Sequence, residues 1–234
     1  MDGQSSERMR RLHRDFDRFD SCADHLLISD TSHGREDIIG TYRLLRQKDA
    51  IRAGGFYSAD EFDIGALLAQ TDGILELGRS CIAAPYRSGR AIRLLWQAIA
   101  AYVFHYDIAF MFGCASLPGT DPDALSAPLA YLHHFHRAPT AVRPRALSHR
   151  YVEMNRLAKD LVDTPTAIRG LPPLLKGYLR LGGFVGDGAV VDAHFNATDV
   201  CIVVKTDQIT RKYHRHFMQR FEPSDSRHSG GNSS

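Results

Sequence analysis

This sequence lacks several features that mark common protein classes. Its four cysteines are widely spaced and form no CxxC pair, which is typical of reduced cytosolic thiols. No apolar run spans a bilayer, because the longest, 92–103, contains Arg93 and Gln97. The charged N-terminal residues lack the apolar region of a signal peptide. A net charge of +2 is no basic excess, so we expect a cytoplasmic protein that does not bind nucleic acid.

The length of 234 residues, with 44% hydrophobic and 24% charged residues, fits one domain with a sizeable core. We expect a basic lead over 1–22, a folded domain over 23–221 and a disordered tail over 222–234. In the lead, apolar residues recur at helical spacing up to Phe19, with arginines between them. This pattern predicts a helix lying on the domain, with a membrane or partner contact as the alternative.

Apolar runs and helical patterns alternate along the domain, which indicates the α/β class. Strands are predicted over 25–29, 38–45, 74–82, 108–116 and 200–204. Helices are predicted over 92–106, 124–136, 173–181 and 206–221, with a turn at 186–188. Ser58 and Glu61 have capping-box spacing, which predicts one more short helix. Three cysteines lie in runs predicted as core strands: Cys81, Cys114 and Cys201.

The strand, turn and helix over 74–103 carry the clearest chemical signal. A helix N-terminus after a glycine-containing turn offers free backbone N–H groups and a positive dipole to phosphate. The residues predicted to bind the phosphate of an acyl donor form this turn: Tyr86, Arg87, Ser88, Gly89, Arg90 and Ala91. The alternative is an ordinary turn with solvated arginines.

Glu76 and Arg79 are charged residues inside an otherwise apolar strand, where an unpaired charge is costly. A bulge at Gly78 would bring the two side chains together and open a slot for the donor beside the strand. Glu76 could then deprotonate an attacking amine, and Arg79 could pair with Glu76 or with a substrate carboxylate. A buried ion pair without a catalytic role is the alternative.

The turn at 86–91 resembles the Gln/Arg-x-x-Gly-x-Gly/Ala pyrophosphate loop of the GNAT superfamily of N-acyltransferases. Gly89 and Ala91 match that loop, whereas Tyr86 stands where Gln or Arg is usual. The resemblance implies a three-layer fold, a mixed and mostly antiparallel twisted sheet flanked by helices. The departure at Tyr86 weakens the case for coenzyme A as donor.

Longer blocks resemble the bacterial ornithine N-acyltransferases within this superfamily. They follow one another in order from about 35 to 217: GTYRLLR, GGFYSADEFD, LELGRSC, FGCASLPGTDP, YLHHFH and LPPLLKGYLRLGGFVGDGAVVDAHFNATDVCIVV. Glu76-x-x-Arg79 also resembles the strand motif of acyl-homoserine-lactone synthases, which share the fold.

This resemblance implies transfer of a 3-hydroxyacyl chain from acyl carrier protein to the α-amine of L-ornithine, which forms lyso-ornithine lipid. Phosphopantetheine would enter as part of the donor, with no tightly bound cofactor and no metal. One alternative acts on another amine, as an N-acyl amino acid or acyl-homoserine-lactone synthase. The other is a non-catalytic module that binds an acyl carrier or a membrane.

The implied mechanism needs an oxyanion donor, for which a backbone N–H near Arg79 and Ser80 is the candidate. Arginines would dock the acidic carrier protein: Arg43, Arg46, Arg87, Arg90 and Arg93. Aromatic residues could line an acyl channel, although plain core packing is the stronger expectation for any one of them: Phe56, Tyr57, Phe62, Phe110 and Phe112.

Four residues are candidates for binding the acceptor, with turn and capping roles as the alternative: Arg43, Asp121, Asn196 and Asp199. His133, His134 and His136 lack a carboxylate or cysteine nearby, so we expect a polar helix face and not a metal site. The basic helix predicted over 206–221 could rest on an anionic membrane, which makes a peripheral location the second expectation.

Overall fold

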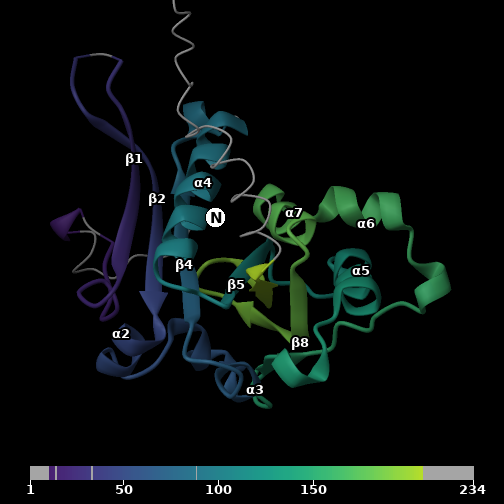
Figure 1. The fold of residues 1–234 in the computed structure, drawn as a ribbon. Helices are drawn as coiled ribbons and strands as arrows, with labels where there is room; N and C mark the ends of the chain where they lie inside the picture. Colours follow the sequence, from purple (N-terminus) through teal and green to yellow (C-terminus); the bar gives the residue numbers. More distant parts are fainter. Residues whose placement is uncertain (1–10, 14, 33, 88, 208–234) are drawn as a thin grey trace, which may run out of the picture.

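The computed structural model describes residues 11–13, 15–32, 34–87 and 89–207. Its strands form a nine-stranded sheet in the order β1-β2-β4-β5-β9-β8-β6-β3, with β7 paired to β8 (Figure 1). The strands are β1 (Asp24–Asp30), β2 (Asp37–Arg46), β3 (Phe62–Asp63), β4 (Ile74–Ile82), β5 (Phe110–Pro118), β6 (Arg145–Ala146), β7 (Tyr151–Val152), β8 (Phe184–Asp192) and β9 (Ala197–Lys205).

The helices are α2 (Gln47–Arg52), α3 (Gly65–Leu68), α4 (Gly89–His105), α5 (Ser126–His136), α6 (Thr164–Gly170) and α7 (Pro173–Arg180). Four short 3-10 helices accompany them: η1 (Tyr57–Asp60), η2 (Ala84–Tyr86), η3 (Thr140–Val142) and η4 (Lys159–Leu161). Among the described residues, no helix is both long enough and apolar enough to cross a bilayer.

The sheet is mixed and mostly antiparallel, as the family resemblance implied. Only β4 with β5 and β6 with β8 pair in parallel among the described strands. The strands predicted over 25–29, 38–45 and 74–82 correspond to β1, β2 and β4. The two remaining predicted strands correspond to β5 and β9, at the centre of the sheet.

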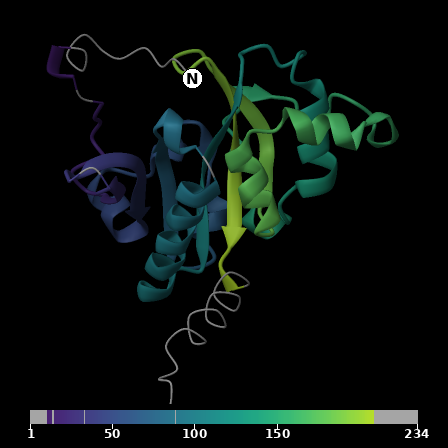
Figure 2. The same cartoon turned by 90° about the horizontal axis from the view of Figure 1, so that it is seen from above.

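Two hydrophobic cores lie on opposite faces of the sheet and create its three layers. On one face, α4 and α7 lie side by side, teal and green in Figure 2, and Trp96 packs edge-on against Tyr178 between them. The stripe predicted for the long helix is confirmed here, because Leu95, Ile99 and Val103 are buried. On the other face, residues of α2, η1 and α3 form a second core together with Phe112.

Four local predictions are wrong. Residues 15–17 have no regular structure and 18–22 form turns, so neither stretch is helical, and Phe19 is buried in the core. The short helix expected near Ser58 is present as the 3-10 helix η1, but the capping box is wrong, because η1 follows Phe56 and has no side-chain cap. The expected turn at 186–188 lies inside β8, where Gly188 has a φ of +81° at a bulge. Cys81 is exposed at the end of β4. Most of the helix predicted over 206–221 lies outside the described residues.

The pairing of β4 with β5 ends early, and this opens the centre of the sheet. The parallel ladder covers Ile74 to Glu76 on β4 and stops opposite Phe112. Gly113 follows directly, and a Cβ there would lie 2.3 Å from the carbonyl oxygen of Leu77. Only glycine allows the two backbones to meet this closely before they diverge.

Beyond that point, β4 pairs with β2 through a bulge. Arg79 and Ser80 stand together opposite Tyr42, between the pairs Gly78–Arg43 and Cys81–Thr41. Arg79 has a φ of +52°, a strained conformation for a residue with a long side chain. The bulge predicted at Gly78 is therefore present one residue further along. It turns the backbone of β4 away from β5.

Candidate functional site

The N-terminal segment closes one side of the site through a shared carboxylate. Asp17 accepts hydrogen bonds from Arg43 Nη1 at 2.6 Å and from Arg79 Nη2 at 2.9 Å. Asp15 and Asp20 add a second carboxylate to Arg79 and Arg43, respectively. Burial raises the pKa of Asp17, but the bonds from the two arginines outweigh it and hold that pKa below its ordinary value.

Glu76 and Arg79 do not form the ion pair that we expected. The bulge directs Arg79 to the two N-terminal aspartates, whereas Glu76 accepts N–H bonds from Tyr57 at 2.9 Å and from Ser58 at 2.7 Å. Glu76 therefore fixes η1 against the sheet at the last ladder pair. Burial raises the pKa of Glu76, although these donors oppose the shift. Its role as the base stays a prediction.

A group of acids lies beside Glu76 on the same face. One ligand atom each from Glu61, Cys114 and Asp199 lies within 4.8 Å of the others. Burial, followed by repulsion from Asp199, raises the pKa of Glu61 to about 7, and burial raises the pKa of Asp199 to about 6. The sequence pointed to Asp199 alone. Glu61 was assigned to a capping box and was missed.

The predicted phosphate turn lies at the start of α4. Tyr86 donates from its hydroxyl to Asp30 Oδ2 at 2.7 Å, so its side chain holds the turn to β1. Arg87 donates to the carbonyl oxygen of Ile82. Gly89 begins α4, Arg90 is exposed and Ala91 is buried; Ser88 lies outside the described residues. Phosphate binding by this turn stays a prediction.

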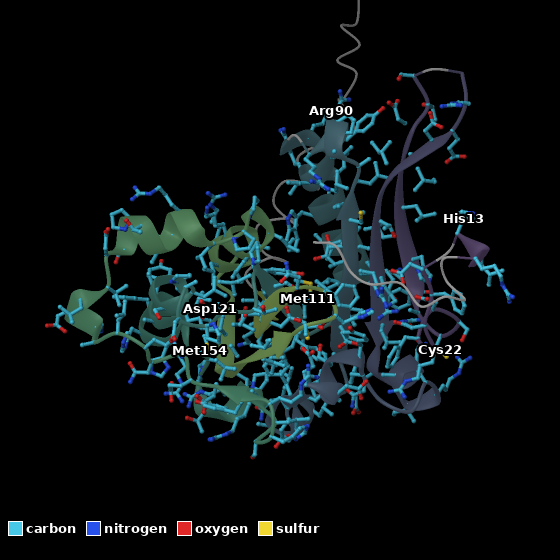
Figure 3. The ribbon with its side chains drawn as sticks, turned by 180° about the vertical axis from the view of Figure 1, so that it is seen from behind. His13, Cys22, Arg90, Met111, Asp121 and Met154 are labelled. Carbon is cyan, nitrogen blue, oxygen red and sulfur yellow. The ribbon has the colours of Figure 1, made fainter. Side chains whose placement is uncertain are left out.

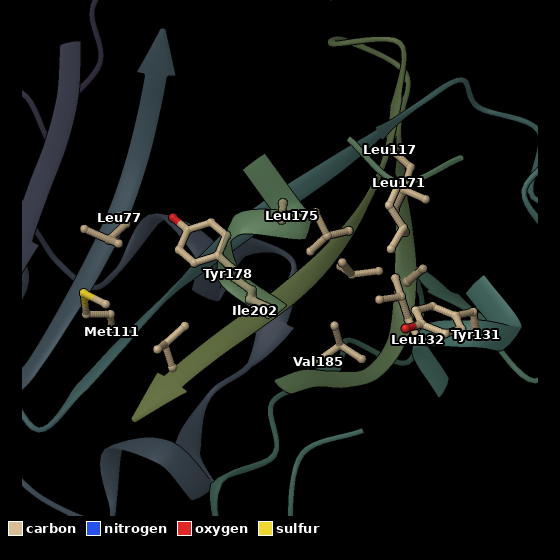
Figure 4. Close-up of a cluster of buried hydrophobic side chains, with 14 of the residues drawn as sticks. Leu77, Met111, Leu117, Tyr131, Leu132, Leu171, Leu175, Tyr178, Val185 and Ile202 are labelled. Atoms are coloured by element: carbon tan, nitrogen blue, oxygen red, sulfur yellow. The ribbon is translucent and has the colours of Figure 1, made fainter. Parts of the chain in front are cut away.

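Three tyrosine and serine hydroxyls link the bulge to α7. Ser80 bonds through its side chain to the hydroxyl of Tyr42, which lies 2.5 Å from the hydroxyl of Tyr178. Tyr178 lies with its hydroxyl toward Leu77 of β4, where β4 and β5 separate (Figure 4). Burial raises the pKa of Tyr178 well above its ordinary value, so this phenol keeps its proton. No sequence pattern had indicated this residue.

The expected docking arginines divide into two groups. Arg43 is 3% exposed and paired with Asp17 and Asp20, so it is part of the fold and not of a docking surface. Arg46 is similarly held by Asp24 and Asp49. The three exposed arginines lie on the turn before α4 and on its first turn: Arg87, Arg90 and Arg93.

The remaining acceptor candidates are scattered. Asp121 is exposed on the loop after β5, and it lies well apart from Arg90 (Figure 3). Asn196 is exposed in the turn between β8 and β9 and has a φ of +49°. Both residues shape turns, because Asp121 accepts the N–H of Asp123 and the carbonyl of Asn196 accepts the N–H of Gly119.

Core packing accounts for most of the proposed aromatic channel. Phe56, Phe62 and Phe112 are buried, and Phe56 meets Phe112 edge-on with ring centroids 5.0 Å apart.

Two of the three histidines on α5 bind separate partners. His134 contacts the carbonyl of Leu157, and His136 contacts the hydroxyl of Tyr131.

Comparisons with known proteins place the chain in a family. Residues 1–97 match the acetyltransferase (GNAT) domain family. The chain is 46% identical over 205 residues to L-ornithine N(alpha)-acyltransferase of Brucella abortus (strain 2308), covering 86% of this chain and 73% of that protein. It is 44% identical to the protein of the same name from Rhodobacter capsulatus, with 88% and 80% covered. The chain belongs to the L-ornithine N(alpha)-acyltransferase family. It is an acyltransferase with the GNAT fold.

Solved structures are more distant. The chain is similar to BjaI, a CoA-dependent acyl-homoserine lactone synthase, with a TM-score of 0.47 and 12% identity, covering 91% of this chain and 77% of that one. It is also similar to FeeM, an N-acyl amino acid synthase, with a TM-score of 0.33 and 9% identity, covering 76% of each chain.

Asp17→Asn tests the shared carboxylate. We expect it to lower the free energy of unfolding by about 2 kcal/mol, because Arg43 is buried and loses one of its two ionic partners. Asp15→Asn is the matched control and is expected to change it by less than about 0.5 kcal/mol, since Asp15 is 62% exposed. Urea unfolding at pH 7 measures both, and equal effects would contradict the model of a shared clamp.

Asp199→Asn tests the buried acid. The folded protein holds the Asp199 proton more tightly than the unfolded chain, so wild-type stability falls as pH rises from about 4 to about 6. Asparagine does not titrate, so the variant does not share this loss. Relative to wild type, its free energy of unfolding should rise by on the order of 2 kcal/mol between pH 4 and pH 7. Urea unfolding across this range checks it, with exposed Asp160→Asn as control. A pH-independent difference would refute the assignment.

Proposed function

We propose that this acyltransferase moves a 3-hydroxyacyl chain from acyl carrier protein to the α-amine of L-ornithine, forming lyso-ornithine lipid. The observation that carries the acceptor is the 44–46% identity to four proteins named L-ornithine N(alpha)-acyltransferase. The donor and the product rest on the resemblance in the sequence blocks, and on a site whose exposed charge suits an acidic carrier.

The start of α4 is the proposed donor end. Arg87, Arg90 and Arg93 are exposed there, and they would attract an acidic carrier protein by complementary charge. Phosphopantetheine, carried by that protein, would then enter the gap between β4 and β5 as part of the donor. The enzyme itself would need no tightly bound cofactor.

The proposed transfer forms a C–N bond and breaks a C–S bond. The deprotonated α-amine attacks the thioester carbonyl, and backbone N–H groups of β4 beyond Leu77 stabilise the oxyanion. Glu76 takes the amine proton directly or through water, since its raised pKa suits a base. Tyr178 donates its proton to the departing thiolate, and the phenolate is at once reprotonated from solvent through the hydroxyls of Tyr42 and exposed Ser80 that are linked to it.

A lipid product would have to reach a membrane, so we propose a cytoplasmic enzyme with a peripheral membrane contact. The basic residues that suggested this contact follow Asp207 and lie outside the described residues.

The reaction is tested by mixing the purified protein with 3-hydroxyacyl carrier protein and L-ornithine and identifying the products by mass spectrometry. We expect lyso-ornithine lipid and free carrier thiol in equal amounts. Acyl-coenzyme A in place of the carrier should give much less product. If product forms with another amine and none forms with ornithine, the proposed acceptor is wrong. If no product forms with any amine while the carrier protein still binds, the proposed reaction is wrong.

Tyr178→Phe tests the proton donor. We expect kcat to fall about 10²-fold with little change in KM, because the thiolate loses its acid while the binding surfaces remain. Tyr131→Phe is the matched control, since it removes another hydroxyl on this face, bonded to His136. Unfolding curves confirm that both variants fold. Unchanged kcat in Tyr178→Phe would assign this hydroxyl to packing alone.

A further inference from the structure

The acids around Cys114 form a buried cluster from three separate segments, which we call the acid pocket. Glu61 follows η1, Cys114 lies on β5, and Asp199 lies on β9 opposite Ser116. Glu61 and Asp199 are each 5% exposed, and one carboxylate oxygen of each lies within 4.8 Å of the other. Two carboxylates held this close in the interior repel each other unless a cation or a proton joins them.

Asp199 has an oxygen without a partner in this pocket. Its Oδ1 is fully buried and has no hydrogen-bond partner among the described residues, although Ser116 bonds to the carboxylate. A buried acceptor that lacks a donor costs about 1–3 kcal/mol, so such a group is commonly completed by water, an ion or a ligand.

The negative charge of the two carboxylates is only partly neutralised. Glu61 Oε1 pairs with Arg150 at 3.1 Å, which supplies one cation for two carboxylates. Asp192 adds further negative potential to both acids. Burial is the main cause of the raised pKa values of Glu61 and Asp199, and repulsion from Asp199 and Asp192, respectively, adds to it.

We propose that Glu61 and Asp199 bind the side-chain ammonium of the diamino acid acceptor, and so select ornithine over amino acids with an apolar side chain. This inference rests on the proposed function for the identity of the acceptor. An ammonium carries three N–H donors, which suit the free Oδ1 of Asp199 and the carboxylate of Glu61.

A divalent metal suits the pocket less well than an ammonium. Arg150 lies against Glu61 and would repel a second, doubly charged cation at close range. Binding a metal through Cys114 requires a thiolate, yet burial and the charge of Glu61 raise the pKa of this thiol well above its ordinary value.

Tyr57 connects the pocket to a cation that suits the other end of an amino acid. The titration of its hydroxyl responds to Cys114 and Glu61, while its ring lies 5.9 Å from the guanidinium of Arg79. Arg79 is partly exposed, and the α-carboxylate of the acceptor could take the place of exposed Asp15 on its guanidinium while Asp17 stays bound. The α-amine, on the same carbon as that carboxylate, would then lie at the Arg79 end, on the face where Glu76 is held.

Calorimetry without donor tests the pocket directly, with L-ornithine and L-norvaline as ligands. Norvaline has the same three-carbon side chain and lacks the terminal amine. We expect wild type to bind ornithine at least tenfold more tightly, and Asp199→Asn and Glu61→Gln to lose most of that preference. Asp160→Asn, at an exposed site on η4, should retain it. Unfolding curves verify that each variant is folded.

The ratio of kcat/KM for the two amino acids gives a second readout with the carrier donor. Asp199→Asn should reduce this ratio at least tenfold by acting on ornithine alone. An equal loss of kcat/KM for both amino acids would show that Asp199 has only a structural role. That result would refute the proposed ammonium binding and leave the proposed transfer reaction untouched. If wild type prefers ornithine in calorimetry but does not acylate it, the proposed reaction fails and the pocket stands. No preference in either measurement overturns the pocket, as does zinc binding that Asp199→Asn abolishes.

Discussion

The close approach of β5 to β4 at Gly113, followed by their separation, is the constraint on which the site depends. The parallel ladder holds Glu76 opposite Phe112 and then ends. Because a side chain at Gly113 would strike the Leu77 carbonyl, the two strands must meet there before they part. Beyond this point the described residues show no pairing of β4 with β5, and the hydroxyl of buried Tyr178 lies toward Leu77 there. The proposed chemistry and the packing thus depend on one irregularity in the sheet.

Charge on the opposite face is arranged around that irregularity. The bulge places Arg79 in a strained conformation, and Asp17 compensates by binding Arg79 and Arg43 together. Glu76 is satisfied by two backbone N–H groups of the segment that also supplies Glu61. The clamp and η1 are therefore structural supports of the site. The protein retains buried charge here because these partners neutralise it, except at Asp199.

The sequence predicted what depends on repeated patterns and missed what depends on single long-range contacts. The apolar stripe from Leu95 to Val103 predicted α4, and the resemblance of the blocks predicted the mixed sheet. Helical spacing in the lead hid the acids at 15–20, because turn geometry there is set by arginines far along the chain. The spacing of Ser58 and Glu61 was ambiguous, because a glutamate at that position can close a capping box or belong to a buried acid cluster. Tyr42 and Tyr178 are 136 residues apart, and no local pattern connects them.

One contact between the two central helices has a practical consequence. The chain contains a single tryptophan, and the indole of Trp96 meets the ring of Tyr178 edge-on with centroids 5.0 Å apart. Under the proposed function, a donor that enters between β4 and β5 would approach this phenol. Because the emission of an indole depends on its immediate neighbours, Trp96 would then report the arrival of the donor without any added label. A stopped-flow trace could thereby separate loading of the proposed thioester from the transfer that follows.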